Sequence, residues 1–71
     1  MTLKEKEVLQ YIILFKTVNQ YAPSIREICE GVHCSNIGTI KEILERLRED
    51  NYITYQDRKP RTIVVKQFNI E

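Results

Sequence analysis

The sequence predicts a mostly helical α+β domain, with three helices followed by a C-terminal two-stranded β-hairpin. Two observations predict this class. Capped apolar repeats of helical period occupy the chain up to Leu47, and the period changes to two after Asn51. A chain of 71 residues forms one domain, and a domain of this size buries roughly 60% of its unfolded surface. We therefore expect a small core to which the apolar side of every helix and strand contributes.

The first helix is predicted to begin after Thr2, because Thr2 and Glu5 have capping-box spacing. Its apolar stripe then follows at helical spacing: Val8, Leu9, Ile12, Phe15 and Val18. Residues 17–22 lose helical character on the approach to Pro23, so the first connection is expected there.

A second, shorter helix is predicted after Ser24, which is a capping residue with Glu27 three positions later. Pro23 discourages helix from entering on the N-terminal side. The apolar positions that follow are Ile25, Ile28, Cys29 and Val32. A segment this short must bury its apolar face against other elements.

The third helix follows a turn at residues 33–36, and either Ser35 or Asn36 is expected to cap it. Its buried stripe is predicted to comprise Ile37, Ile40, Ile43, Leu44 and Leu47. The opposite face carries Gly38, Lys41, Glu42, Glu45 and Arg48. Two helices joined by so short a turn have helix-turn-helix spacing, so DNA binding is the first hypothesis.

Two β-rich runs, at residues 52–55 and 62–65, predict a hairpin with a polar turn between them. Pro60 lacks an N–H donor, so the second strand is expected to start at or just after Arg61. A helix-turn-helix followed by a hairpin is a winged helix-turn-helix, with the hairpin as its wing.

The distribution of basic residues indicates that phosphate contacts come from the C-terminal part of the chain. The net charge is only +1 and the pI is about 7.8, whereas strong nucleic-acid binders usually exceed a pI of about 9. Residues 58–66 nevertheless contain four basic side chains and no acidic one. Positive charge is therefore concentrated in the predicted wing.

Other classes of protein find little support. No apolar run approaches the roughly 20 residues of a membrane span, and the mixed charges of residues 4–7 do not suit a signal peptide. We expect a cytoplasmic protein without a membrane partner.

The spacing of Cys29 and Cys34, even with His33 counted, does not match that of a metal site. Neither a metal, a disulfide nor a cofactor is predicted.

Several blocks of the chain resemble the N-terminal DNA-binding domain of the LexA repressor family. They are Tyr21–Ile28, Thr39–Ile40, Leu44–Leu47, Asn51–Ile53 and Lys59–Ile63, in register without gaps. The resemblance implies a domain at residues 1–66 with a tail at 67–71, from a prokaryotic or phage-type protein associated with the nucleoid. It also implies that the third helix enters the major groove, and that the wing lies on the backbone or in the minor groove.

The chain departs from the family pattern in three ways. His33 and Asn51 stand where the family commonly has glycine, and both residues tolerate positive φ better than most. The recognition-helix residues are not the family's usual set, so the operator need not be the family's operator. Family members also carry a C-terminal domain with a serine-lysine self-cleavage dyad and the dimer interface, and nothing after Val65 supplies either. We therefore expect an excised domain or a protein without that half, and in both cases no enzyme.

We predict three groups of DNA-binding residues. The major-groove group is Ser35, Asn36, Gly38, Thr39, Lys41 and Glu42. The backbone group at the start of the second helix is Ser24 and Arg26, and the wing group is Arg58, Lys59 and Arg61. Asn36 suits adenine, Lys41 guanine or a phosphate, and Glu42 the cytosine amino group. Arg26 has an equal alternative, which is pairing with Glu30 at i+4.

The competing hypothesis is a winged helix that binds a protein partner or regulates without reading DNA. It rests on the near-neutral charge and on the acids Glu42, Glu45, Glu49 and Asp50.

The leading hypothesis is binding to double-stranded DNA in transcriptional repression. If it holds, tight binding needs two copies of the domain. A homodimer on symmetric half-sites one helical turn apart is then the geometric expectation.

Overall fold

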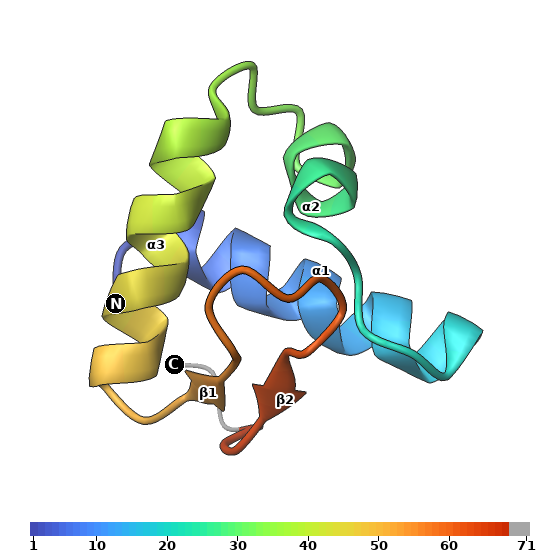
Figure 1. Ribbon diagram of the computed structural model, residues 1–71. Helices are drawn as coiled ribbons and strands as arrows, with labels where there is room; N and C mark the ends of the chain where they lie inside the picture. Colours follow the sequence, from blue (N-terminus) through green and yellow to red (C-terminus); the bar gives the residue numbers. More distant parts are fainter. Residues whose placement is uncertain (69–71) are drawn as a thin grey trace.

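The computed structural model describes residues 1–68, and it confirms the predicted fold class (Figure 1). The elements in chain order are α1 (Leu3–Asn19), α2 (Ile25–Gly31), α3 (Ile37–Glu49), β1 (Ile53–Thr54) and β2 (Val64–Val65). Part of the predicted tail, residues 69–71, lies outside the described residues. Within residues 1–68, no helix combines the length and apolarity needed to cross a membrane.

Each helix begins at a side chain that satisfies free backbone N–H groups. The capping boxes predicted at Thr2 and Ser24 are both closed, with Glu5 and Glu27 reaching back to the cap N–H groups. Asn36, rather than Ser35, caps α3: its side chain accepts from the Gly38 N–H at 2.9 Å. Local hydrogen bonding therefore fixes where all three helices start.

The core lies where the three helices meet, and the sheet contributes to it. The largest fully buried side chains come mainly from α1, α2 and α3: Leu9, Ile12, Ile28, Ile40, Leu44, Leu47, Ile53 and Val8, with Pro23. Ile53 precedes the connection between the strands and Ile63 ends it, and both are buried in the same cluster. One side chain of β1 and one from the residue before β2 thus attach the sheet to the helices.

The predicted apolar stripes need four corrections. Val18 is 70% exposed, because α1 continues beyond the part that α2 and α3 cover (Figure 1). Phe15 is half-buried and packs on the ring of Tyr21, with ring centroids 5.6 Å apart. Ile37, in the first turn of α3, is also only half-buried. Ile25, the first residue of α2, is half-buried as well. The four exceptions lie at the starts of α2 and α3 and toward the end of α1.

The predicted hairpin is shorter than its sequence suggested. β1 and β2 pair antiparallel over two residues each, with Ile53 opposite Val65, and β2 starts at Val64 rather than at or just after Arg61. Arg58 and Arg61 have left-handed φ values of 64° and 60°, which a strand does not accommodate. Residues 55–63, here called the wing loop, therefore leave the ladder.

The two positions where the family has glycine adopt the expected backbone. His33 has φ 56° and Asn51 has φ 64°, in the left-handed region that glycine adopts most readily. His33 lies in the turn between α2 and α3, and Asn51 lies between α3 and β1. Both turns therefore keep their form with a non-glycine residue.

A nearly buried carboxylate joins the start of α1 to α3. Glu5 is 6% exposed, and its Oε2 lies 3.2 Å from Nη1 of Arg46. The pKa of Glu5 is held below its usual value, first by the Thr2 N–H and then by Arg46, against the opposing effect of burial. The capping box of α1 thus also orients α3.

The corrected core is tested by truncating two residues of α1. Ile12→Ala should lower the free energy of unfolding by about 2–5 kcal/mol, because a fully buried side chain leaves a cavity. Val18→Ala, on the exposed part of the same helix, should change it by less than about 0.5 kcal/mol. Urea denaturation of both variants measures the difference. Similar losses in the two variants would contradict the assigned end of the core.

Candidate nucleic-acid interface

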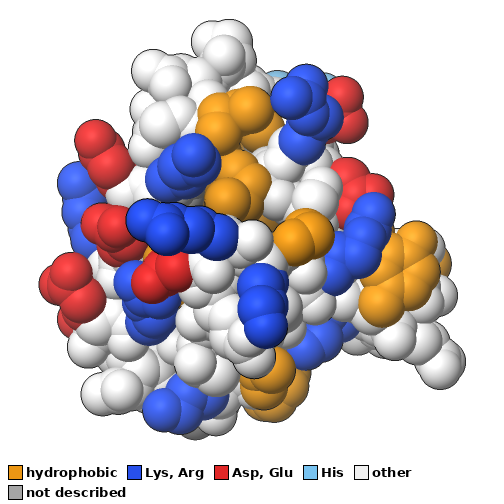
Figure 2. All heavy atoms as spheres, viewed as in Figure 1, with side chains coloured by type: hydrophobic (Ala, Val, Ile, Leu, Met, Phe, Trp, Pro, Cys, Tyr) orange, Lys and Arg blue, Asp and Glu red, His pale blue; other side chains and the backbone are white. Residues whose placement is uncertain are grey.

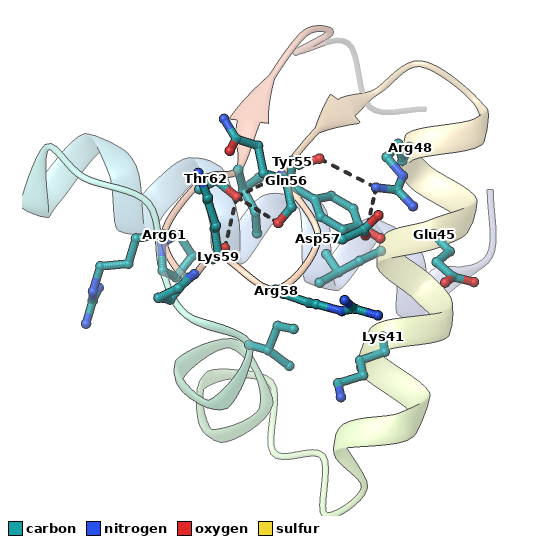
Figure 3. A pocket seen from close by; sticks show the side chains of 15 residues that line it. Lys41, Glu45, Arg48, Tyr55, Gln56, Asp57, Arg58, Lys59, Arg61 and Thr62 are labelled. Atoms are coloured by element: carbon teal, nitrogen blue, oxygen red, sulfur yellow. Dashed lines mark hydrogen bonds and ion pairs between the residues drawn. The ribbon is translucent and has the colours of Figure 1, made fainter.

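An open groove of about 870 Å³ separates α3 from the wing loop (Figure 3). Lys41, Glu45 and Arg48 lie along its α3 side, and the wing loop forms the other side. Apolar atoms of Pro23, Ile25, Leu44 and Ile63 also line it. The groove therefore places the wing loop beside Lys41 and the later turns of α3, whereas the other predicted major-groove residues do not line it.

The predicted major-groove residues lie together at the start of α3. Ser35, Asn36, Gly38, Lys41 and Glu42 are exposed, and Thr39 is half-buried. The core side of the same helix holds Ile40, Ile43 and Leu44. The solvent face of the first two turns is therefore free of core contacts and can enter a groove of DNA.

Asn36 already uses one side-chain atom within the protein. Its Oδ1 accepts the Gly38 N–H, whereas a bidentate contact with adenine needs both the oxygen and the nitrogen of the amide. A Cβ added at Gly38 would stand 3.1 Å from the same Oδ1. The cap therefore fixes the orientation of the Asn36 amide and favours Gly38 beside it.

Three cations line the groove without an acidic partner. Lys41 projects from α3, and Arg58 reaches from the wing loop toward it, with Lys59 further along the loop (Figure 3). The ion pairs within residues 1–68 involve other basic residues: Lys4, Arg46, Arg48 and Arg61. Lys41, Arg58 and Lys59 are therefore available to an anion from outside the chain.

The predicted backbone group at the start of α2 is divided. Ser24 accepts the Glu27 N–H at 3.1 Å and is half-buried, so its hydroxyl serves the cap. Arg26 is exposed, and the alternative ion pair with Glu30 is not formed in the described part of the chain. The Arg26 guanidinium is therefore without an ion pair in the described part of the chain, and its contact with a phosphate stays a prediction.

Arg48 is a contributor that sequence reasoning did not assign to the site. Its Nη1 lies 3.2 Å from Oδ1 of Asp57, and its guanidinium stacks 4.1 Å from the centre of the Tyr55 ring. Burial raises the pKa of the Tyr55 hydroxyl, although the Arg48 charge opposes this effect. Arg48 therefore fastens the first part of the wing loop to α3.

Arg61, predicted as a wing contact to phosphate, makes several contacts within the chain. Its two terminal nitrogens donate to the two carboxylate oxygens of Glu27 at 2.9 and 3.2 Å. Nη1 also donates to the Ala22 carbonyl at 3.2 Å. The pKa of Glu27 is lowered, first by the Ser24 N–H and then by Arg61. This pair could not be predicted from residue spacing, because its members are 34 positions apart.

The two thiols lie near the turn before α3, with Cys29 in α2 and Cys34 in the turn itself. Cys29 is buried and its thiol donates to the Cys34 carbonyl, while the Cys34 thiol donates to the Asn36 carbonyl at 3.4 Å. Burial raises the pKa of Cys29. Within residues 1–68, no group of His, Cys, Asp and Glu side chains is arranged to hold a metal ion.

Basic side chains extend across the middle of the face that contains α3 and the wing loop (Figure 2). Most acidic side chains on this face lie toward its edges (Figure 2). The chain is nearly neutral overall, so this arrangement depends on where the charges lie rather than on their sum. A face of this kind attracts a polyanion.

Comparison with known proteins gives one consistent result. The sequence profile of the LexA DNA binding domain matches residues 1–62. The chain is 38% identical over 65 residues to the LexA repressor of Desulforamulus reducens, covering 92% of this chain and 30% of that protein. It is 35% identical over 60 residues to the LexA repressor of Carboxydothermus hydrogenoformans, covering 84% and 29%. The chain thus spans under a third of the length of these relatives.

The cap on α3 is tested at Asn36. Asn36→Ala should lower the free energy of unfolding by about 1 kcal/mol, because the Gly38 N–H loses its acceptor. Asn36→Ser keeps a capping oxygen and should retain most of that stability. Denaturant unfolding of the free protein measures both variants without DNA. Equal stability of the wild type and Asn36→Ala would show that the cap contributes nothing.

Proposed function

The chain belongs to the family of LexA DNA-binding domains, and we propose how it performs sequence-specific binding to double-stranded DNA. In this proposal, the first two turns of α3 enter the major groove, and the wing loop lies on the phosphate backbone. Because the relatives are named LexA repressors, we propose transcriptional repression as the outcome. The matched family is a DNA-binding module and not a catalytic one.

One observation carries the proposal: unpaired cations of α3 and the wing loop line the same groove. Lys41, Arg58 and Lys59 have no ion pair within residues 1–68, and they line the same groove, where Lys41 also belongs to the predicted major-groove group. Phosphate contacts position a protein on a duplex, and base contacts specify the sequence. The groove supplies groups suited to both tasks.

Base readout is proposed for the exposed polar residues at the start of α3. Lys41 would donate to guanine or to a phosphate, and Glu42 would accept from a cytosine amino group. Ser35, Asn36 and Thr39 would complete this surface, with Gly38 allowing close approach. Each good pair contributes about 1–3 kcal/mol of discrimination. These residues would decide the operator sequence.

Affinity is proposed to come mainly from the cations outside the reading surface. Arg58 and Lys59 would contact phosphates, with Arg26 and Ser24 at the start of α2. One copy with so few contacts binds nonspecific DNA with a Kd of about 10⁻⁴–10⁻⁶ M. Tight regulation would therefore use two copies on symmetric half-sites, bound to the nucleoid. The acids Glu42 and Glu45 suit a protein partner as well, but the family match favours DNA.

The wing contribution is tested with the double variant R58A/K59A. Removing two phosphate contacts should reduce the slope of log K against log salt by about 1.8, since each contact contributes about 0.9. The probe is a duplex recovered by in vitro selection from a random DNA library. Fluorescence anisotropy across a range of salt concentrations gives the slope for wild type and variant.

Two results would contradict the proposal. An unchanged slope in R58A/K59A would remove the wing loop from the interface. Recovery of no consensus sequence from the random library would contradict sequence-specific reading by α3. The variant K6A, in the first turns of α1, is a control for the loss of a positive charge, because Lys6 has no ion pair within residues 1–68. Its slope should fall by much less than that of R58A/K59A.

A further inference from the structure

We propose that Glu27 and Arg61 form a latch that positions the wing loop for DNA, so that both act as positioning residues for Arg58 and Lys59. The inference rests on the proposed function, because it concerns how the same interface is held in place. It assigns Glu27, an acidic residue, a favourable effect on DNA binding. It also assigns Arg61 a main role other than phosphate contact.

The wing loop needs such a latch because its backbone provides little support. The ladder beneath it has only two residue pairs, and two-stranded hairpins are marginal in water even when longer. Within the loop, the Thr62 hydroxyl accepts the Gln56 N–H at 2.9 Å and donates to the Lys59 carbonyl at 3.1 Å. These bonds shape the loop but do not attach it to the helices.

The latch attaches the loop to the start of α2. The Arg61 guanidinium makes a bidentate contact with the Glu27 carboxylate and donates a third hydrogen bond to the Ala22 carbonyl. It also lies 4.8 Å from the centre of the Tyr21 ring. Such bidentate, charge-assisted contacts fix orientation as well as distance. Arg58 and Lys59 are therefore held at a defined position relative to the helix-turn-helix.

Glu27 is itself fixed, which makes it a suitable anchor. Its Oε1 accepts the Ser24 N–H at 2.8 Å in the capping box, and the same oxygen accepts from Arg61. The carboxylate thus belongs to α2 and to the wing loop together. Preorganising a binding loop raises affinity because less freedom is lost on binding.

A direct role of Arg61 at a phosphate predicts the opposite behaviour from a latch. Its side chain is 43% exposed, so exposure alone does not separate the two roles. If Arg61 acted only through its charge, neutralising the nearby Glu27 would strengthen DNA binding by removing a repulsion. If the latch positions the loop, the same change weakens binding. The sign of the effect is therefore decisive.

The experiment compares E27Q, R61K and the control E30Q in the full chain, in salt titrations against the selected duplex. E27Q preserves the capping box, because a glutamine side chain can also accept the cap N–H. R61K preserves the positive charge but loses the bidentate contact of the guanidinium. We expect E27Q and R61K each to raise Kd about three- to tenfold, because the loop must then be ordered on binding. E30Q removes an equal charge from exposed Glu30 of α2 and should not raise Kd.

The same variants are then made in the R58A/K59A background. There E27Q should have little effect, because the loop no longer carries the side chains that it positions. Hydrogen exchange of the free proteins provides a second readout: amides of residues 56–62 should lose protection in E27Q and R61K, with those of α1 unchanged. Unfolding of E27Q in denaturant identifies any global loss of stability.

The outcomes separate the inference from the function on which it rests. If R58A/K59A binds as tightly as wild type with the same salt slope, the proposed role of the wing fails. If that double variant weakens binding but E27Q binds equally or more tightly, the latch is refuted and the wing role stands. If E27Q raises Kd equally in the wild-type and R58A/K59A backgrounds, the latch is also refuted. Glu27 would then affect DNA binding independently of Arg58 and Lys59.

Discussion

A ladder of two residue pairs cannot hold a loop in place, and this constraint shapes the rest of the molecule. The chain holds the wing with side chains instead. Ile53 and Ile63 bury the ends of the connection in the core, and Lys16 of α1 donates to the Ile63 carbonyl at 3.0 Å. Arg48 and Arg61 then fasten opposite parts of the loop to α3 and α2. These side-chain contacts thereby connect the wing loop, which is mostly exposed, to the helices around the core.

The basic residues divide into those that hold the fold and those that face outward. Arg46, Arg48 and Arg61 are paired with Glu5, Asp57 and Glu27. Arg48 also stacks on a tyrosine ring, and Arg61 makes a bidentate contact, both of which suit the planar guanidinium. Lys41, Arg58 and Lys59 line the groove unpaired within residues 1–68. This sorting explains how a chain of net charge +1 presents basic side chains to a polyanion. Several acids are paired with basic residues of the same chain, and Lys41, Arg58 and Lys59 line one groove.

Prediction from sequence succeeded where the cause is local. Ser24 and Glu27 are three residues apart, so their capping box follows from spacing alone. The positive φ of His33 and Asn51 was expected from the resemblance, because the family commonly has glycine at both positions. Contacts between distant residues were not predictable. Glu27 meets Arg61 across 34 positions and Glu5 meets Arg46 across 41, because packing of the helices brings them together. Arg61 was assigned to the interface for its charge, and only the folded chain gives it a partner; its contact with phosphate stays a prediction.

The central claim is that the start of α3 and the wing loop form one binding surface. The most direct measurement is an NMR titration of the ¹⁵N-labelled chain with a selected DNA duplex. The largest amide shift changes should fall at residues 35–42 and 57–61, while the exposed part of α1 around Leu14 and Val18 should change little. Changes concentrated on that apolar part of α1, with α3 and the wing loop unaffected, would contradict the claim.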